Sequence, residues 1–380
     1  MGMTRRDRLM ATLRGEPVDR PAVSFYEIGG FVTDRHDPSP FNIYNAPDWG
    51  PLLDLAEEKT DLIRMAVPAR TPVHPEVINR IAKETVSEKN GSRCIHTTYT
   101  IGGRTLTYRA RRDPDVQTSW TLEHLVKDMD DLKAFLDMPD AFFERHQDLA
   151  PLHAAEAEVG DRGIVMMDTP DPICQAASLF SMEDYTVMAL TENELFHRVL
   201  EKVAAPLWRE TEEIAARFPG RLWRIYGPEY ASEPYLPPSL FKEYVCRYTE
   251  PMVRSIRKYG GYARIHCHGR LKNILSAIAG MGADGLDPIE PPPQGDMDLI
   301  DVRRQVGRQM VLFGNLEASD IENLAPPEFE GRVRRALEQG TAGEGRGFVL
   351  MPSASPYGRA ITPQTLENYR TMVRLVETWG

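Results

Sequence analysis

The chain has 380 residues, of which 42% are hydrophobic and 27% charged, and its formal net charge is −11. This composition is typical of a soluble globular protein, and the acidic excess excludes a general nucleic-acid binder, because neutralising phosphates needs clustered Lys and Arg. No apolar run approaches the roughly 18 residues of a membrane helix, and the basic N-terminal segment lacks the apolar core of a secretory signal, so we expect a cytoplasmic protein.

Short β-branched or aromatic runs alternate with longer amphipathic stretches along the whole chain. Eight runs are candidate strands, at residues 21–26, 61–66, 163–168, 222–226, 262–266, 285–289, 310–314 and 347–351. Helical periodicity marks residues 4–15, 181–218, 238–259, 271–282, 298–307, 326–340 and 363–379. This alternation favours a parallel α/β fold, and the number of strands predicts a (β/α)8 TIM barrel preceded by an N-terminal helical extension.

One segment breaks this rhythm. Residues 92–112 alternate with period two around Gly102-Gly103, which predicts a β-hairpin with a tight primed turn. We interpret it as an insertion at the barrel rim. Since no Ser/Gly-rich linker divides the chain, residues 1–380 are predicted to form a single domain.

Polar residues gather just after the predicted strands, where the active sites of such barrels lie. In chain order they are Glu27, Asp168, Asp171, Glu229, Glu233, His266, His268, Asp287, Glu290, Asn315, Glu317, Ser353 and Ser355. Strand side chains alternate between the two faces, so His266 and His268 point the same way while Cys267 points the other way.

The two same-face histidines have two interpretations. They could hold a zinc ion, which takes imidazole nitrogen and carboxylate oxygen and keeps about three protein ligands in a catalytic site. Glu229 is then the first choice for the third ligand and Glu233 the second. Alternatively, both imidazoles are hydrogen-bonded to carboxylates or water and bind no metal.

The cysteines suggest no further metal site. Cys94, Cys174, Cys246 and Cys267 are widely separated and show no CxxC spacing. We therefore expect reduced thiols rather than disulfides or a cysteine-only zinc site. Cys267 is predicted to be buried against a helix, and Cys174 to be an inert core residue.

Several segments together resemble the uroporphyrinogen decarboxylase superfamily, which includes decarboxylases and corrinoid-linked methyltransferases. They are "TRRDRLMATLRGEPVDRPAV" at the N-terminus, "LPPSLFKEYVCRYTEPMVRSIRKYGG", the region around "FGNLEASDI", and the terminal "SPYGRAITPQTLENYRTMV". The resemblance spans most of the chain and implies a TIM barrel.

The methyltransferase branch is the more similar one. The decarboxylases carry an arginine-rich segment after the first strand, whereas this chain reads "FYEIGGF", whose Glu27 would repel a polycarboxylated porphyrinogen. The methyltransferases bind zinc through H-x-C-G at the fifth strand and a later Cys. Here "HCHG" places His266 at the first ligand position and His268 at the second, and "MPSASP" has no cysteine.

The resemblance therefore implies a methyltransferase that moves a methyl group between a small O- or N-methylated compound and a corrinoid (cobalamin) on a separate protein, assisted by zinc. The candidate catalytic residues are Glu229, Asp168 and Glu27, and the candidate metal ligands are His266, His268 and Glu229. The alternative is a metal-free decarboxylase or lyase, in which the histidines act as acid and base with Glu229 or Asp168. A non-catalytic ligand-binding barrel is a third possibility.

Overall fold

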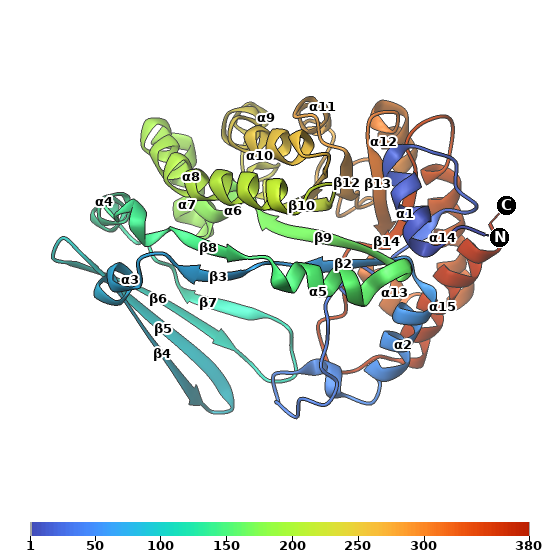
Figure 1. The fold of residues 1–380 in the computed structure, drawn as a ribbon, viewed down its shortest axis with the longest axis horizontal. Helices are drawn as coiled ribbons and strands as arrows, with labels where there is room; N and C mark the ends of the chain where they lie inside the picture. The colour runs from blue at the N-terminus through green and yellow to red at the C-terminus, as the bar shows by residue number, and fades with distance from the viewer. Residues whose placement is uncertain (1, 380) are drawn as a thin grey trace.

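The computed structural model describes residues 2–379, and its central element is a parallel sheet of eight strands in the order β1-β14-β13-β12-β11-β10-β9-β2 (Figure 1). The strands are β1 (Ala22–Val23), β2 (Leu62–Ala66), β9 (Gly163–Pro170), β10 (Leu222–Tyr226), β11 (Tyr262–Cys267), β12 (Gly285–Pro288), β13 (Val311–Leu316) and β14 (Phe348–Pro352). Each corresponds to one of the eight predicted runs. The predicted TIM-barrel fold is confirmed.

The buried carboxylate of Asp61 joins the two ends of this sheet. The backbone N–H of Asp61 donates to the carbonyl of Val23 over 2.7 Å, and the Val23 N–H donates to the Asp61 side chain over 2.9 Å. Arg8 and Arg20 donate to the same carboxylate over 2.5 and 2.9 Å. These bonds link β1 to the start of β2 and attach the N-terminal helix to both. They also satisfy the carboxylate of Asp61, which is fully buried.

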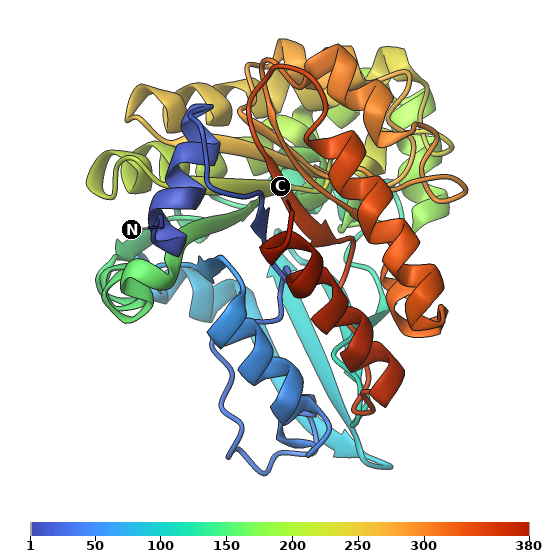
Figure 2. The same cartoon turned by 90° about the vertical axis from the view of Figure 1, so that its right-hand side faces the viewer.

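Helices cover the outside of the sheet (Figures 1 and 2). They include α1 (Arg5–Arg14), α2 (Trp49–Lys59), α6 (Pro172–Ala177), α7 (Met182–Thr191), α8 (Asn193–Arg217), α9 (Pro238–Leu240), α10 (Arg247–Lys258), α11 (Leu275–Gly280), α12 (Leu299–Val306), α13 (Ala318–Asn323), α14 (Pro326–Gly340) and α15 (Pro363–Glu377). Figure 2 shows α2 and α15 packed side by side. Within residues 2–379, no helix combines the length and the apolar character that crossing a membrane requires.

Most predicted helices are present, with two differences. The predicted helix at 181–218 is interrupted at Glu192, between α7 and α8, and the one at 238–259 contains a π-helical turn, η5 (Phe241–Cys246), between α9 and α10. The barrel helices α2, α6 and α13 were not predicted.

The interior of the barrel is filled by side chains from alternate strand positions. Those packed together there include Ile63, Met65, Ile164, Met166, Leu222, Val311, Phe313, Val349 and Met351. Leu9 and Leu13 of α1 belong to the same cluster, so the N-terminal helix closes the end where the strands begin. Polar residues occupy the opposite end, where the strands finish.

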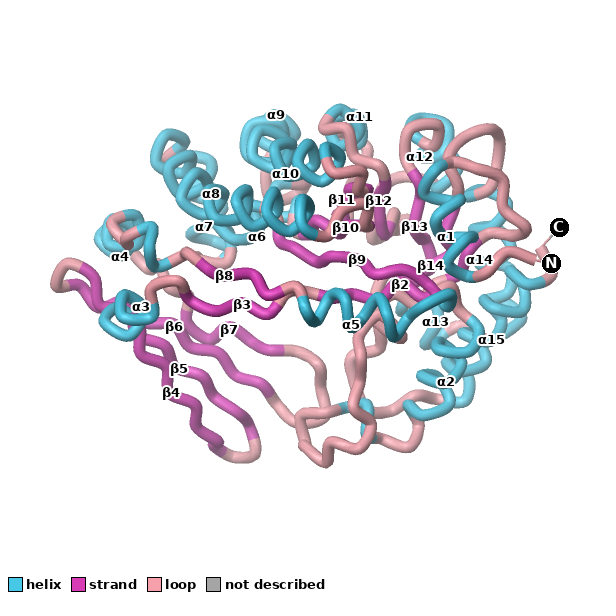
Figure 3. The backbone as a smooth tube through the Cα atoms, viewed as in Figure 1, coloured by secondary structure: helices cyan, strands magenta, loops and turns pink. Residues whose placement is uncertain are grey.

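The segment between β2 and β9 is an insertion with sheets of its own (Figure 3). It contains a pair of antiparallel strands, β3 (Ala69–Pro72) and β8 (Arg145–Asp148), with α3 (Pro75–Ile81), α4 (Met129–Leu136) and α5 (Ala150–Val159). A second sheet runs β4 (Ala82–Lys89), β5 (Ser92–Ile101), β6 (Arg104–Arg112) and β7 (Ser119–Glu123).

The predicted hairpin at 92–112 is confirmed as β5 and β6, which pair from Ile101 with Arg104 outward. Gly102 and Gly103 both have positive φ, +56° and +84°, as a primed turn requires. The hairpin is not isolated, because β4 and β7 extend it to four strands. Both were missed from the sequence.

Candidate active site at the barrel mouth

The alternation that fills the barrel interior also selects the residues of its mouth, the end at which the strands finish. Two or four residues after the apolar side chains of the interior, the inward-facing positions of the strands carry polar groups. These residues are Asp168 on β9, Arg224 and Tyr226 on β10, Arg264, His266 and His268 along and after β11, Asp287 on β12, Asn315 and Glu317 along and after β13, and Ser353 after β14.

His266 is buried and held by a carboxylate. Its Nδ1 lies 2.6 Å from Oδ2 of Asp287, and because a carboxylate can only accept, Nδ1 carries the proton. Asp287 is fully buried and also accepts a 2.6 Å bond from Arg264. Burial acts to raise the pKa of Asp287, but Arg264 and His266 outweigh it and hold that pKa well below its usual range. The result is an ionised carboxylate between an arginine and an imidazole.

His268 is held in the same way but in a more exposed position. Its Nδ1 lies 2.7 Å from Glu290, which also accepts the backbone N–H of Gly269 over 2.6 Å. Gly269 has a φ of +80°, so a glycine suits the turn that brings its N–H to Glu290. The side chain of His268 is 36% exposed, compared with 7% for His266.

The pKa values of the two imidazoles are shifted in opposite directions. Burial lowers the pKa of His266 below its ordinary value, despite the opposite effect of Asp287. Burial also acts to lower the pKa of His268, but the hydrogen bond and charge of Glu290 outweigh it and raise that pKa. The rings lie edge to face with centroids 4.6 Å apart. An imidazole with a lowered pKa therefore lies beside one with a raised pKa, an arrangement that suits acid and base roles.

Arg224 forms the second polar group of the mouth. Its Nε and Nη2 donate to the two oxygens of Asp168 over 2.6 and 3.0 Å, and its Nη1 donates to the hydroxyl of Tyr26. The Tyr26 ring in turn stacks on His266, with centroids 5.9 Å apart. Asp168, a predicted catalytic residue, therefore uses both oxygens to hold Arg224.

Glu27 and Glu317 carry carboxyl groups that form no ion pair among the described residues. Burial raises the pKa of Glu27, Arg224 acts against it, and Asp168 adds to it. Burial, together with the charge of Glu290, raises the pKa of Glu317 to about 7. One oxygen of Glu317 accepts from Ser353 over 3.2 Å, while Oε1 is buried without a partner.

Glu229 lies on the short 3₁₀ helix η4 (Pro228–Ala231) rather than on a strand face. Its Oε2 is buried without a hydrogen-bond partner in residues 2–379, as is Oδ2 of the fully buried Asp171. Gly227 precedes η4 with a φ of +113°, and a Cβ there would come within 2.2 Å of Cys174. The close approach of this turn to α6 places Glu229 beside Asp171.

The cysteines take no part in the mouth. Cys267 is 1% exposed and packs with the outer core beneath the helices, as predicted from its position between the two histidines. Burial raises the pKa of the thiols of Cys267 and Cys174, which keeps both in the unreactive neutral form.

The donor set of the mouth fits a catalytic zinc only in part. Both Nδ1 atoms are bonded to carboxylates, as is usual for metal-binding histidines, which leaves each Nε2 as the ligand atom. However, across residues 2–379 no three His, Cys, Asp or Glu side chains are grouped so as to hold a metal ion. Zinc, and Glu229 as its third ligand, therefore stay predictions.

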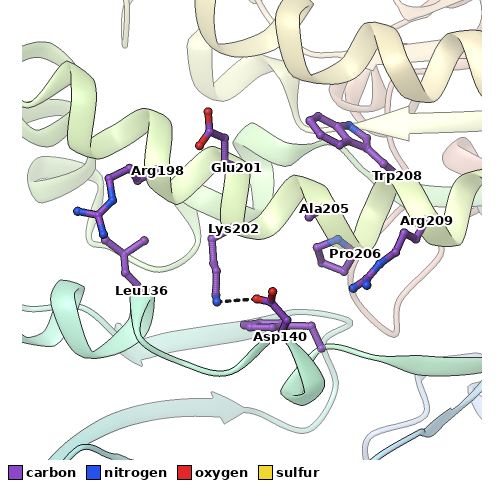
Figure 4. Close-up of a pocket in the computed structure, with 10 residues that line it drawn as sticks. Leu136, Asp140, Arg198, Glu201, Lys202, Ala205, Pro206, Trp208 and Arg209 are labelled. Carbon is purple, nitrogen blue, oxygen red and sulfur yellow. Dashed lines mark hydrogen bonds and ion pairs between the residues drawn. The ribbon is translucent and has the colours of Figure 1, made fainter.

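A separate cavity of about 560 Å³ lies on the outside of the barrel, between α8 and the loop after α4 (Figure 4). Lys202, Asp140 and Arg209 among its charged groups already have partners within the protein. Lys202 pairs with Asp140 over 2.9 Å, and Trp208 donates its indole N–H to a backbone carbonyl over 2.8 Å. Since it also lies away from the strand ends, we place the active site at the mouth.

The structure thus brings together His266, His268, Asp168 and Glu27 at one end of the barrel, with Glu229 beside them. The sequence analysis missed Tyr26, which follows β1, and Arg224 and Arg264, which lie within β10 and β11. A signal was present, because an arginine inside an apolar strand must have a buried partner. "LWRIY" and "YARIH" each contain one.

Comparisons with known proteins agree with this architecture. The family model of uroporphyrinogen decarboxylase (URO-D) matches residues 103–379, more than half of the chain. No curated protein matches the chain in sequence. Among solved structures, a methyltransferase from Methanosarcina mazei has a TM-score of 0.59 at 16% identity, covering 99% of this chain and 98% of its own. A protein provisionally assigned as a vitamin-B12-independent methionine synthase, from Listeria monocytogenes, has a TM-score of 0.39 at 14% identity, covering 68% and 71%.

Proposed function

We propose a function from the premise that the chain belongs to the uroporphyrinogen decarboxylase (URO-D) family: it is a methyltransferase that moves a methyl group between a small O- or N-methylated compound and a corrinoid on a second protein. One observation carries the proposal. Two adjacent imidazoles at the mouth are each held by a carboxylate, and their pKa values are shifted in opposite directions, upward for His268, which lies nearer to solvent.

This arrangement supplies what the departure of a methyl group requires. When a methyl group leaves an oxygen or nitrogen, the electron pair of the broken bond stays on that atom, which must be neutralised to be a good leaving group. His268 can donate a proton to the leaving atom, because Glu290 stabilises its charged form. The neutral His266, fixed by Asp287, can accept a hydrogen bond at Nε2 and orient the substrate.

A reduced corrinoid would supply the nucleophile that accepts the methyl group. Exposed apolar and aromatic residues in the loops that follow the strands support such a partner. They are Phe31 and Val32 after β1, Val67 after β2, Tyr235 after β10 and Tyr357 after β14. An apolar rim around a polar centre is typical of a surface that another molecule covers.

The charges of the mouth argue against a porphyrinogen decarboxylase. Binding several substrate carboxylates requires unpaired cations, but the guanidinium of Arg224 is matched by Asp168 and that of Arg264 by Asp287. Glu27 adds a negative group beside Arg224. A decarboxylase or lyase that acts on a smaller substrate remains the alternative, with the same two histidines as acid and base.

The test is methyl transfer from small O- and N-methylated compounds to a reduced corrinoid protein, with substitution of the proton donor. We expect His268→Gln to lower the rate roughly 10²-fold or more, since that is the usual contribution of a general acid. Glu183→Gln, on the exposed start of α7, is the matched control. Full activity of His268→Gln would refute the assignment, and carbon dioxide release without methyl transfer would favour the alternative.

Zinc assistance is tested separately by elemental analysis. If His266 and His268 hold zinc through Nε2, purified protein should contain it, and His266→Ala should lose metal and activity together. Metal content that is unchanged by His266→Ala would show that the pair is not the ligand set.

A further inference from the structure

Two arginines lie opposite each other on neighbouring strands of the inserted sheet. Arg93 of β5 and Arg112 of β6 are direct partners in the antiparallel register, so their side chains lie on the same face of the sheet. Like charges in such a cross-strand pair repel each other and destabilise it. A negative group bound between the two side chains would remove this repulsion.

The protein itself supplies little negative charge to these arginines. Within residues 2–379, Arg93 has one ion pair, with Glu88 over 3.8 Å, and the side chain of Glu88 is 64% exposed. Arg112 donates to the carbonyl of Phe41 over 2.6 Å and to the side-chain oxygen of Gln117 over 3.0 Å, which are both uncharged acceptors. Its Nε is buried without a partner among the same residues. Most donors of the two guanidinium groups therefore have no acceptor within the described chain.

Arg93 and Arg112 line a pocket of about 330 Å³ between the inserted sheet and the loop that follows β1. Phe31, Phe41 and Tyr44 of that loop supply an apolar part of the lining. The guanidinium carbon of Arg93 lies 4.2 Å from the ring centroid of Phe41, a contact that holds this arginine at the pocket. A concave site with an apolar lining and a few polar groups is typical of a small-molecule site.

The two acidic residues of the same lining are bonded to the backbone of their own loop. Asp34 accepts the N–H of His36 over 2.8 Å, and Asp37 accepts the N–H of Ser39 over 3.0 Å. Neither forms an ion pair with the two arginines among residues 2–379. These acids would repel a doubly charged anion more than a singly charged one, which favours a carboxylate over a phosphate.

From these observations we infer that this pocket binds a small organic carboxylate, whose oxygens accept hydrogen bonds from Arg93 and Arg112 and whose apolar part lies against the aromatic lining. Guanidinium groups match the oxygens of a carboxylate in both geometry and charge. The site shares no residue with the polar groups of the mouth. The inference therefore does not depend on the proposed methyl transfer.

The test measures the binding of matched probes to the full-length protein by calorimetry. Benzoate and benzamide have nearly the same size and shape, but only benzoate is charged at neutral pH. We expect benzoate to bind at least tenfold more tightly than benzamide, and more tightly than inorganic phosphate. Equal binding of benzoate and benzamide would overturn the inference, and tighter binding of phosphate would refute the assignment to carboxylates.

Two variants locate the site. Arg93→Gln and Arg112→Gln each remove one charged donor and should each weaken benzoate binding roughly tenfold or more, because hydrogen bonds to charged groups are the stronger class. Arg109→Gln is the matched control, since Arg109 is exposed on β6 and lies on the opposite face of the sheet. If Arg112→Gln does not fold, because it also loses its bond to Phe41, Arg93→Gln decides alone. Unchanged benzoate affinity in either variant that folds would refute the inference.

Thermal unfolding separates this site from benzoate binding elsewhere on the protein. A ligand that binds only the folded state raises the Tm, so benzoate should raise the Tm of the unsubstituted protein and of Arg109→Gln. The increase should be smaller in Arg93→Gln, which has lost part of the site. An equal increase in all three proteins would place the bound benzoate elsewhere and overturn the inference.

Discussion

The carboxylate bonded to each histidine contributes to the pKa of that histidine and so to its proposed role. Glu290 is the group that raises the pKa of His268 against the effect of burial. Replacing it in Glu290→Gln removes that charge, so the pKa of His268 should fall and a smaller fraction should be protonated at neutral pH. If His268 is the proton donor, the limb of the pH–rate profile on which activity falls as pH rises should move to lower pH.

Titration of the His268 ring by NMR measures the shift directly. Glu183→Gln serves as the control, because it removes an exposed acidic group that is not among the residues of the mouth. A pKa for His268 that is the same in Glu290→Gln and in the unsubstituted protein would contradict the assignment of Glu290 as the stabilising charge.

Asp287 should be among the most costly residues to change. It is fully buried and contacts both Arg264 and His266, so Asp287→Ala leaves a buried guanidinium without its counter-charge. Breaking a buried pair from one side typically costs about 3–5 kcal/mol. We expect a loss of that size in the free energy of unfolding, measured with urea.

An exposed pair provides the comparison for Asp287. Arg304 and Asp301 lie 3.3 Å apart with most of both side chains in solvent, so Arg304→Ala should cost at most about 1 kcal/mol. Because the pKa of Asp287 is lowered on folding, its contribution is present above the pKa of an unfolded aspartate and is lost as pH falls through the folded pKa. A similar loss from Arg304→Ala and Asp287→Ala would show that the buried pair is not stabilising.

Some of these residues could be predicted from the sequence and others could not. The shared face of His266 and His268 follows from strand periodicity alone. Their partners do not, because the contact between His266 and Asp287 depends on the register in which β11 pairs with β12. A register one residue away would have turned Asp287 to the other face.

At the scale of elements, the strands of the inserted sheet pair only with one another and with no strand of the barrel sheet. Its buried side chains, such as Leu106 and Ala110, lie in β6 and not in any barrel strand. We therefore expect that removing residues 92–112 abolishes the four-stranded sheet but leaves the barrel folded. Circular dichroism should retain the helical signal, and thermal unfolding should remain cooperative.

A matched deletion separates this outcome from general damage. Removing β11, which lies in the middle of the barrel sheet, should abolish folding altogether. If the protein without residues 92–112 also fails to fold, the hairpin is part of the core and the interpretation as an insertion is wrong.

The barrel strands were predictable because parallel strands covered on both faces are continuous apolar runs. The strands β4 and β7 were not, since almost every residue in them is exposed and their pattern resembles a loop. They are strands only because β5 and β6 offer hydrogen bonds at both edges of the hairpin. This information comes from tertiary contacts and not from local sequence.

At the scale of the whole molecule, the barrel supplies the proposed site for the methyl donor, and a second protein supplies the corrinoid acceptor. Helices cover the outside of the central sheet. Polar groups lie at its mouth, and exposed residues such as Tyr235 and Tyr357 lie in the loops that follow the strands. The sequence could predict this architecture because eight apolar runs alternate with helices. It could not predict which residues would form the rim, because loop conformation sets their exposure.

Exposed apolar residues beside the mouth are typical of a surface that another molecule covers. We therefore expect methyl transfer to need a second protein that carries a corrinoid. The isolated chain, given a methylated donor and no corrinoid, should produce no demethylated product. Product should appear when a reduced corrinoid protein is added. Mass spectrometry of the donor and its demethylated product measures both reactions.

Substitution of an exposed residue beside the mouth tests whether the second protein docks there. Tyr357 is 62% exposed and follows β14, so Tyr357→Asp should weaken docking of the second protein while leaving the fold intact. The rate should then become limited by the concentration of the corrinoid protein and recover when that concentration is raised. Trp120→Asp, which is exposed on the inserted sheet, should change neither. Demethylation by the isolated chain at the full rate would contradict the need for a partner, because the methyl group would then have an acceptor within the chain or in solvent.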